Sequence, residues 1–269
     1  MTPAPMATAT SSLRNSLAIQ RRVIGALLMR EVITRFGRHN LGVLWLVAEP
    51  MMFTVGVATL WTLSGQHHGS SIPIIAFAVT GYSSVLMWRN AVGRCNSAIH
   101  SNLNLLYHRN VRVIDVLITR ILLEEAGATA SFIVLALFFT VTEWIVPPED
   151  LMAVLAGWLM LAWFGAALAL TVGALTAYSS LIERLWHPIS YLLFPLSGAG
   201  FMIDWMPPGA QQLLWWVPMV HGTEMLRQGY FGSIVRTHYD LAYMAICCLV
   251  LTLTGLFLTR DAGRRVEAE

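Results

Sequence analysis

Acidic side chains inside apolar segments are the first residues of this sequence that could take part in chemistry. Glu49 stands beside Pro50 in the segment HNLGVLWLVAEPMMFTVGVATLWTL, and Glu124 follows the segment VIDVLITRILL. A carboxylate in such surroundings is costly unless it pairs with a cation or becomes protonated. We therefore expect Glu49 to form an ion pair, and Arg89 and Arg94 of the next apolar segment approach the same side of the predicted bundle.

The motifs of common catalytic sites are missing from the sequence. All 17 basic residues are arginine, so a phosphate-binding loop of the Walker A type, which requires a lysine, is excluded. Neither HExxH nor GxSxG occurs, and the three cysteines have no metal-ligand spacing. The pair His67 and His68 lies in a glycine-containing loop, where solvation is the simpler interpretation. We predict no metal site and no catalysis by this chain alone, so any energy for its work must come from a partner.

Hydropathy defines the elements that must position these residues. Hydrophobic residues make up 56% of the chain and charged residues 12%, with a mean hydropathy of +0.62. A helix needs about 20 apolar residues to cross a bilayer, and none of the apolar runs alternates as a barrel strand does. The sequence therefore predicts an all-α polytopic membrane protein with six transmembrane helices, at about residues 41–63, 72–93, 117–142, 151–177, 186–203 and 241–259.

The arginines predict which ends of these helices are cytoplasmic. They are concentrated before the first predicted span, between the second and third, between the fourth and fifth, and after the last. The connections at 64–71 and 142–150 contain no arginine. By the positive-inside rule, both termini are predicted to be cytoplasmic and the segment 204–240 to lie outside.

Four segments outside the predicted spans have distinct patterns. Residues 1–12 are predicted to be a disordered cytoplasmic tail, and residues 13–38 an amphipathic interfacial helix with arginines on its polar face. That helix is either a simple topology anchor or also a contact for substrate or partner. The link between the second and third predicted spans is polar but keeps apolar residues, as a helix packed on a cytoplasmic protein would. Prolines divide 208–230 into two short helices, predicted to re-enter the outer leaflet.

Three segments resemble the permease subunits of bacterial polysaccharide ABC exporters, which belong to the ABC-2 type. They are LLMREVITRFGRHNLGVLWLVAEP, LLYHRNVRVIDVLITRILLE and WVPMVHGTEMLRQGYF, in the order that the family has them, and they span most of the chain. The details are most similar to the capsule-exporting KpsM type, with the O-antigen-exporting Wzm type a close relative. The matching residues are Arg30, Glu31, Arg35, Phe36, Gly37, Leu41, Gly42, Leu44, Trp45, Glu49 and Pro50, then Tyr107, Arg109, Val111, Asp115, Arg120, Leu123 and Glu124, then Trp216, Pro218, His221, Glu224 and Arg227.

The resemblance implies a half-transporter in the bacterial inner membrane that exports a lipid-linked acidic polysaccharide. Residues 39–269 would form the transmembrane domain of a homodimer, surrounded by membrane lipid. Two copies of a separate ATPase subunit would hold ATP and Mg²⁺, and this chain would bind no cofactor and no nucleic acid. A periplasmic-facing co-polymerase and an outer-membrane exporter would complete the system. The family's coupling loop would lie at about 104–116, with the ATPase-coupling residues Leu105, Leu106, Tyr107, Arg109, Val113 and Asp115. The implied residues of the outer-face helices are Trp216, Pro218, His221, Glu224 and Arg227.

The resemblance also gives the charged and aromatic residues candidate roles. One interpretation of the charged residues is a structural lock, and the other is a polar patch where an anionic lipid-linked glycan reaches the channel. The charged candidates are Arg35, Arg38, Glu49, Arg89 and Arg94. The channel would be framed by the first and fifth spans of both copies. Its candidate aromatic residues are Trp61, Trp186, Tyr191, Phe194 and Phe201.

Other functions remain open at the level of sequence. A permease for O-antigen or a teichoic-acid-type glycan, or an ABC-2 permease for a drug or lipid, would use the same fold. A membrane-embedded transferase acting on lipid-linked sugar belongs to a different class. It would require a convergent set of acidic and basic groups facing a cavity, which the sequence does not indicate.

Overall fold

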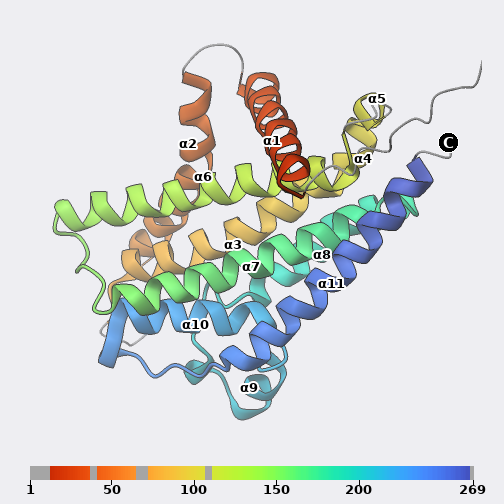
Figure 1. Ribbon diagram of the computed structural model, residues 1–269. Helices are drawn as coiled ribbons and strands as arrows, with labels where there is room; N and C mark the ends of the chain where they lie inside the picture. Colours follow the sequence, from red (N-terminus) through yellow and green to blue (C-terminus); the bar gives the residue numbers. More distant parts are fainter. Residues whose placement is uncertain (1–12, 37–40, 65–71, 107–110, 267–269) are drawn as a thin grey trace, which may run out of the picture.

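The chain forms a bundle of long helices, seen in a computed structural model that describes residues 13–36, 41–64, 72–106 and 111–266 (Figure 1). Within these ranges the regular elements are all helices, with no strand. The prediction of an all-α protein is therefore confirmed. The predicted tail at 1–12 lies outside the described residues.

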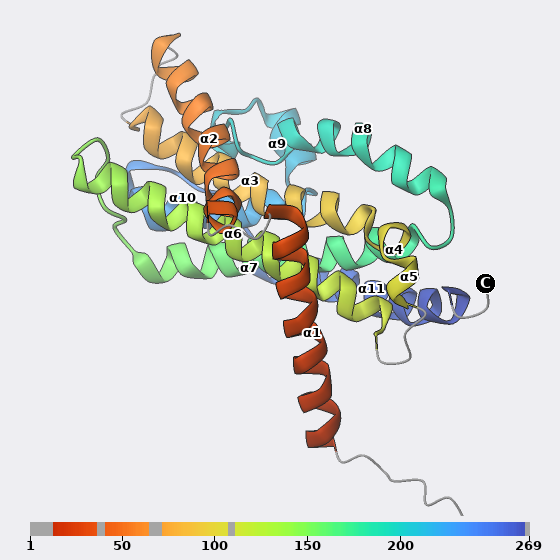
Figure 2. The same ribbon diagram turned by 90° about the horizontal axis from the view of Figure 1, so that it is seen from above.

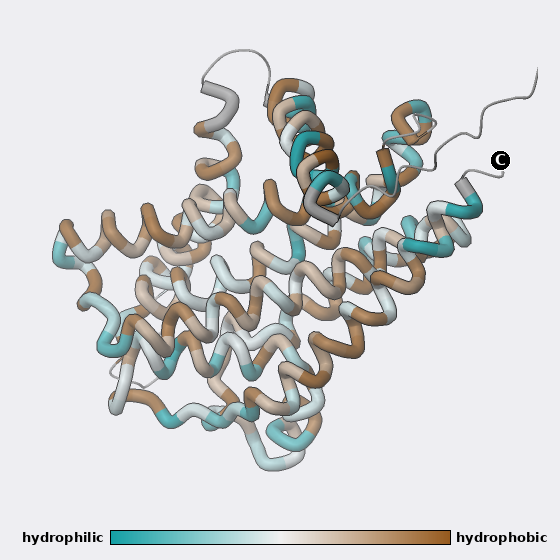
Figure 3. Tube along the Cα trace, in the orientation of Figure 1, coloured by the Kyte–Doolittle hydropathy of each residue, from teal (hydrophilic) through white to brown (hydrophobic). Residues whose placement is uncertain are grey.

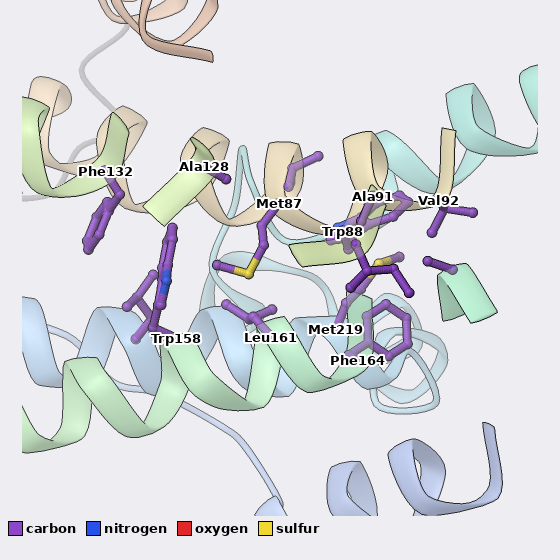
Figure 4. Packing of buried hydrophobic residues seen from close by; sticks show 14 of the residues in the cluster. Met87, Trp88, Ala91, Val92, Ala128, Phe132, Trp158, Leu161, Phe164 and Met219 are labelled. Atoms are coloured by element: carbon purple, nitrogen blue, oxygen red, sulfur yellow. The ribbon is translucent and has the colours of Figure 1, made fainter. Parts of the chain in front are cut away.

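Six long helices make up the bundle: α2 (Leu41–Leu63), α3 (Ile74–Asn96), α6 (Val113–Val141), α7 (Leu151–Leu175), α8 (Ser180–Leu196) and α11 (Leu241–Val266). Helix α7 is central, since it packs against α3, α6 and α11. It begins at a capped N-terminus, where Oδ1 of Asp150 accepts hydrogen bonds from the backbone N–H groups of Met152 and Ala153. Between α3, α6 and α7 the core combines aliphatic and aromatic side chains, and the rings of Phe132 and Trp158 stack at 4.3 Å (Figure 4).

Four helices of the described part are long and apolar enough to cross a membrane: Leu44–Leu63, Val113–Val141, Leu151–Leu175 and Leu241–Arg265. Figure 3 shows the apolar character of α6, α7 and α11 along most of their length. Helices α3 and α8 do not meet the same measure of length and composition. Helix α3 carries two arginines and several small polar residues, and α8 has only 17 residues.

The predicted fifth span at 186–203 differs from the helix that forms there. Helix α8 starts earlier, at Ser180, because the hydroxyl of Ser179 accepts a hydrogen bond from the N–H of Leu181 at 3.2 Å. It ends at Leu196, and Gly198 then takes a left-handed conformation with φ of +81°. Glycine adopts this conformation without a steric penalty. The helix at this position is therefore shifted toward the N-terminus.

Helix α1 (Leu13–Phe36) is one continuous helix that runs across the other helices rather than along them (Figure 2). It packs on α6 and α2. Its outward side combines exposed apolar residues such as Leu17 and Met29 with exposed arginines such as Arg21. This mixture is typical of a helix lying at a membrane surface. Residues 37 and 38 of the predicted 13–38 helix lie outside the described residues.

The link between α3 and α6 contains two single-turn helices, α4 (Ala98–Ser101) and α5 (Leu103–Leu106). Leu105 and Leu106 belong to α5, whereas Tyr107 and Arg109 lie outside the described residues. Val113 and Asp115, the last residues of the predicted coupling set, belong to α6, and their role in coupling stays a prediction. They form the first turn of α6, where Oδ2 of Asp115 accepts a hydrogen bond from the N–H of Arg112 at 3.1 Å. Figure 1 places α1, α4, α5 and the end of α11 at the same end of the bundle.

The two short helices predicted at 208–230 are present as α9 (Pro208–Leu214) and α10 (Pro218–Phe231). Helix α10 is buried almost all round because glycines bring it close to α7. A Cβ atom on Gly157 would lie 2.7 Å from the backbone nitrogen of Leu226, and one on Gly229 would lie 2.5 Å from that of Val154. The α7–α10 contact therefore requires glycine at these positions.

Candidate functional site

Four charged residues from four helices meet in what we call the charged cluster: Arg35 of α1, Glu49 of α2, Arg94 of α3 and Glu124 of α6. Nη2 of Arg35 lies 3.3 Å from Oε2 of Glu49, and Nη1 contacts Oε1 of Glu124. Nε of Arg94 lies 3.4 Å from that same oxygen of Glu124, and Nη2 lies 3.9 Å from Oε1 of Glu49. Each carboxylate thus faces both guanidinium groups.

Burial makes Glu124 the centre of the charged cluster. Its side chain is 5% exposed, against 47% for Glu49. A buried carboxylate needs its cationic partners more than an exposed one does, since water cannot replace them. From sequence, Glu49 is expected to form the central ion pair, and no partner is predicted for Glu124. The spacing of Arg120 and Glu124 along one helix points to a different pair, whereas the observed partners of Glu124 come from α1 and α3.

The Glu49–Pro50 pair lies where α2 and α6 pack closely. Pro50 has no N–H to offer the carbonyl of Leu46, one turn earlier. A Cβ atom on Gly127 of α6 would lie only 3.1 Å from that carbonyl oxygen, so the two backbones approach there. Next to it, the hydroxyl of Ser131 donates to the carbonyl oxygen of Val47 at 2.6 Å. These contacts hold Glu49 against α6.

Arg120 of α6 connects the charged cluster to the neighbouring helices. Its Nη1 donates to the carbonyl oxygen of Arg94 at 2.6 Å, and its Nη2 donates to the hydroxyl of Ser101 in α4 at 2.9 Å. Its Nε lies 3.3 Å from Oε1 of Glu31 in α1. One side chain therefore joins α1, the end of α3 and α4. A second link between α1 and α6 is the hydrogen bond from Gln20 to Oδ1 of Asp115 at 3.0 Å.

Arg89 is not part of the charged cluster, contrary to the grouping made from sequence. Its guanidinium carbon lies 5.0 Å from the centre of the Tyr191 ring and 5.5 Å from that of Phe194. Such distances allow a cation–π interaction. Arg38, the remaining member of the predicted set, lies outside the described residues.

The rings near Arg89 form an aromatic face between α2, α3 and α8, made of Phe53, Trp61, Tyr82, Tyr191 and Phe194. The ring of Tyr82 is central, at 5.3 Å from Trp61, 5.7 Å from Phe194 and 5.8 Å from Phe53. Tyr191 is 67% exposed. The structure thus brings together three of the predicted channel aromatics and adds Phe53 and Tyr82, which the sequence analysis missed.

The other two predicted channel aromatics are placed differently. Trp186 is buried, at 5% exposure. Phe201 lies in the segment after α8, where its carbonyl oxygen accepts a hydrogen bond from Arg227. Neither belongs to the aromatic face.

Arg227 of α10 holds the segment that follows α8. It is fully buried, and its guanidinium group donates to the carbonyl oxygens of Gly198, Ala199 and Phe201, each at 2.6 Å. The guanidinium carbon also lies 3.7 Å from the centre of the Phe77 ring in α3. Burial lowers the pKa of Arg227, and the nearby carboxylate of Glu224 opposes this effect. The side chain thus satisfies buried backbone carbonyl groups of the irregular segment that follows α8.

His221 and Glu224 fix two further segments to α10. Nδ1 of His221 accepts from the N–H of Asp240 at 2.9 Å, so the protonated Nε2 donates to the carbonyl oxygen of Trp215, also at 2.9 Å. Burial lowers the pKa of His221, consistent with this neutral form. The two oxygens of Glu224 accept from the N–H groups of Ile203 and His238, and burial raises the pKa of this carboxyl group. These buried residues organise the polypeptide around α10.

Pro218 and Trp216, the other two residues predicted for the outer-face helices, lie at and just before the start of α10. Pro218 is the first residue of α10, where its missing N–H has no cost. Trp216 is 72% exposed, and its carbonyl oxygen accepts from the hydroxyl of Tyr243 at 2.9 Å.

The described residues form a helical bundle that includes apolar helices of membrane length. Ion pairs join this bundle to α1, which crosses it. These features define a polytopic membrane protein. The chain belongs to the ABC-2 type transporter family, whose sequence model matches residues 22–231. The charged cluster and α10 both lie within that range. A transporter family agrees with the prediction of a permease rather than an enzyme.

Individual relatives are similar over nearly their whole length. The capsule polysaccharide export inner-membrane protein CtrC of Neisseria meningitidis serogroup B is 44% identical over 259 residues, covering 96% of this chain and 98% of CtrC. The capsule polysaccharide export inner-membrane protein BexB of Haemophilus influenzae is 41% identical with the same coverage. The polysialic acid transport protein KpsM of Escherichia coli is 26% identical over 257 residues, covering 92% of this chain and 96% of KpsM.

Proposed function

We propose that this chain is the transmembrane permease subunit of an ABC transporter that exports a lipid-linked capsular polysaccharide across the inner membrane. The observation that carries the proposal is the similarity to CtrC and BexB, which extends over 98% of the length of each. Both are named as inner-membrane proteins of capsule polysaccharide export. KpsM, with lower identity, is named as a polysialic acid transport protein.

The energy for export comes, in this proposal, from a separate ATPase subunit. The chain has no lysine for a Walker A loop, and ATP and Mg²⁺ would be bound by the partner. The contact would be made by α4 and α5 and the residues that follow them. Arg120 supports this role, because it joins Ser101 of α4 to Glu31 of α1 and to the backbone of Arg94. A movement of α4 would therefore be passed to α1 and to the charged cluster.

Within this mechanism the charged cluster serves as a structural lock rather than as a substrate site. Glu124 is 5% exposed and already contacts two guanidinium groups. Although the Arg94 side chain is 44% exposed, both guanidinium groups are already paired with carboxylates, so an anionic glycan would have to compete with these ion pairs. The lock would keep α1 in register with α2, α3 and α6 while the ATPase cycles.

The glycan itself would meet the aromatic face. Aromatic rings provide stacking surfaces for the apolar faces of sugar rings, and Arg89 beside Tyr191 would attract acidic sugars. Helix α8 has a row of exposed apolar residues, including Leu181, Leu192 and Leu196. A second copy of the chain would cover this side, so that α2 and α8 of both copies frame the channel.

The proposed topology has six spans, with α3 and α8 crossing alongside the four apolar helices. Both termini would be cytoplasmic, as the distribution of arginines indicates. Helices α9 and α10 would re-enter the membrane from the outer side. A periplasmic-facing co-polymerase and an outer-membrane exporter would continue the path of the glycan.

Deletion of the gene tests the proposal. Strains without it should synthesise the polysaccharide and retain it inside the cell, and a plasmid copy should restore it at the surface. Immunogold labelling of sectioned cells locates the glycan. Glycan at the surface of the deletion strain would rule out an export role. A strain that makes no glycan at all would instead support a transferase.

A further inference from the structure

A pocket with a volume of about 350 Å³ lies between α5, the start of α6 and the end of α11. Its walls are of two kinds. Leu106, Val113 and Leu256 contribute apolar surface, and Arg112, Arg260 and Arg264 contribute positive charge. Neither the charged cluster nor the aromatic face includes any of these residues.

Among the residues that the structure describes, no carboxylate lies within ion-pair distance of the three arginines, and Arg264 acts on Asp261 only at longer range. Arg260 and Arg264 are one turn apart on α11 and therefore lie on the same face of that helix. The nearest acidic residues are engaged elsewhere. Asp115 accepts hydrogen bonds from Gln20 and from the backbone of Arg112, and Asp261 pairs with Arg265 at 3.1 Å. The positive charge in the pocket is thus available to an anionic ligand.

The apolar wall of the pocket continues onto the exposed side of α11. Leu256 is 41% exposed, and the exposed apolar residues Leu249, Val250 and Leu253 precede it along the same helix. Because α11 is of membrane length and apolar, this side meets the hydrocarbon of the bilayer. The pocket therefore lies at the end of α11, between the apolar surface of this helix and its terminal arginines.

We infer that this pocket binds the headgroup of an anionic phospholipid, with an acyl chain lying along Leu256 and the exposed side of α11. Basic pockets between membrane helices are suited to such headgroups. A purely acidic peptide of a partner protein would satisfy the arginines but leave the apolar wall uncovered. A phospholipid covers both. The bound lipid would join α5, which is part of the proposed ATPase contact, to the end of α11.

Native mass spectrometry of the purified permease–ATPase complex tests the inference, with phosphatidylglycerol as the anionic probe and phosphatidylethanolamine as the zwitterionic one. The complex should retain more phosphatidylglycerol than phosphatidylethanolamine. Each arginine near an anionic headgroup contributes about fivefold in affinity. Arg260→Gln should therefore weaken binding by about fivefold and the triple variant R112Q/R260Q/R264Q by about a hundredfold.

Arg184→Gln is the matched control, since Arg184 is an exposed arginine of α8 outside the pocket. It should leave retention unchanged. Leu256→Trp should also weaken lipid binding, because the larger side chain fills part of the apolar side of the pocket without removing charge. This variant replaces the triple variant in the test if the triple variant does not fold. An excess of soluble glycerol phosphate, which has the charge but no acyl chain, should not displace the lipid.

Four results would overturn the inference. The triple variant could retain phosphatidylglycerol as the unaltered protein does, or the two phospholipids could bind equally well. The triple variant could also lose the ATPase subunit while it keeps the lipid, which would make the pocket a protein contact. Displacement by glycerol phosphate would likewise assign the pocket to a soluble anion.

Discussion

Nε of Arg94 in α3 lies 3.4 Å from Oε1 of Glu124 in α6, and Arg35 of α1 contacts the same oxygen. One buried carboxylate thus joins a helix that crosses the bundle to two helices within it. Glu49 shares both arginines but is half exposed. The stability of the lock should therefore depend more on Glu124 than on Glu49.

Glu124→Gln should destabilise the protein more than Glu49→Gln does. Removing one partner of a buried ion pair typically costs about 3–5 kcal/mol, whereas an exposed pair contributes at most about 1 kcal/mol. We expect a lower thermal unfolding midpoint for Glu124→Gln in the same detergent, and a small change for Glu49→Gln. If both variants lower the unfolding midpoint equally, burial does not make Glu124 the centre of the lock.

Glu49→Gln should still reduce export of the glycan. Normal expression of this variant together with normal export would argue against any role for Glu49.

Arg120→Gln should separate ATP hydrolysis from export. The substitution removes the hydrogen bond to Ser101 of α4 and the ion pair with Glu31 of α1. Coupling between two sites is typically worth a factor on the order of tenfold, so we expect glycan exported per ATP hydrolysed to fall by about that factor. The measurement is made on the permease–ATPase complex in proteoliposomes. Arg22→Gln, at an exposed position of the same helix as Glu31, is the control. An unchanged ratio would mean that Arg120 has only a structural role.

Arg227→Lys should not preserve the structure around α10, although it keeps the charge. The planar guanidinium group reaches three carbonyl oxygens at once, and a lysine ammonium group is a compact point charge with different geometry. Hydrogen bonds to a charged group contribute about 1.5–3 kcal/mol each. Because lysine should lose two of the three, the free energy of unfolding should fall by more than about 3 kcal/mol. Arg236→Lys, at an exposed position, is the comparison in a thermal unfolding assay. If both lysine variants unfold at the same temperature, Arg227 is not needed to hold the segment after α8.

Gly229→Ala should weaken the contact between α7 and α10. The added Cβ would lie 2.5 Å from the backbone nitrogen of Val154, and backbone cannot move aside as a flexible side chain can. Overpacking of this kind costs about 1–3 kcal/mol. Gly25→Ala on α1 is the matched control, because a Cβ there meets no atom within 4 Å. It should stabilise the helix by up to about 1 kcal/mol. Opposite shifts of the unfolding midpoint are therefore expected, and a shift in the same direction would contradict the packing argument.

The sequence predicts those features of the fold that depend on nearby residues. Apolar runs locate α2, α6, α7 and α11, and the prolines between 207 and 218 locate the short helices, since hydropathy and proline act locally. The need of Glu49 for a cation also follows from its own surroundings.

Features that depend on which helix faces meet were not predicted. The partners of Glu124 come from α1 and α3, and Arg89 faces α8 instead of Glu49. The chain after the end of α8 is held by Arg227 of α10, a residue far along the chain. Such pairings are set by tertiary packing, and no local pattern of residues contains them.

The central claim is that this chain is a membrane permease whose energy is supplied by a separate ATPase. The most direct measurement reconstitutes the chain with and without its ATPase subunit in proteoliposomes and follows movement of the lipid-linked polysaccharide across the bilayer after ATP is added. Movement should require both subunits and ATP, and the permease alone should hydrolyse no nucleotide. Movement of the glycan without the ATPase, or ATP hydrolysis by the purified permease, would contradict the claim.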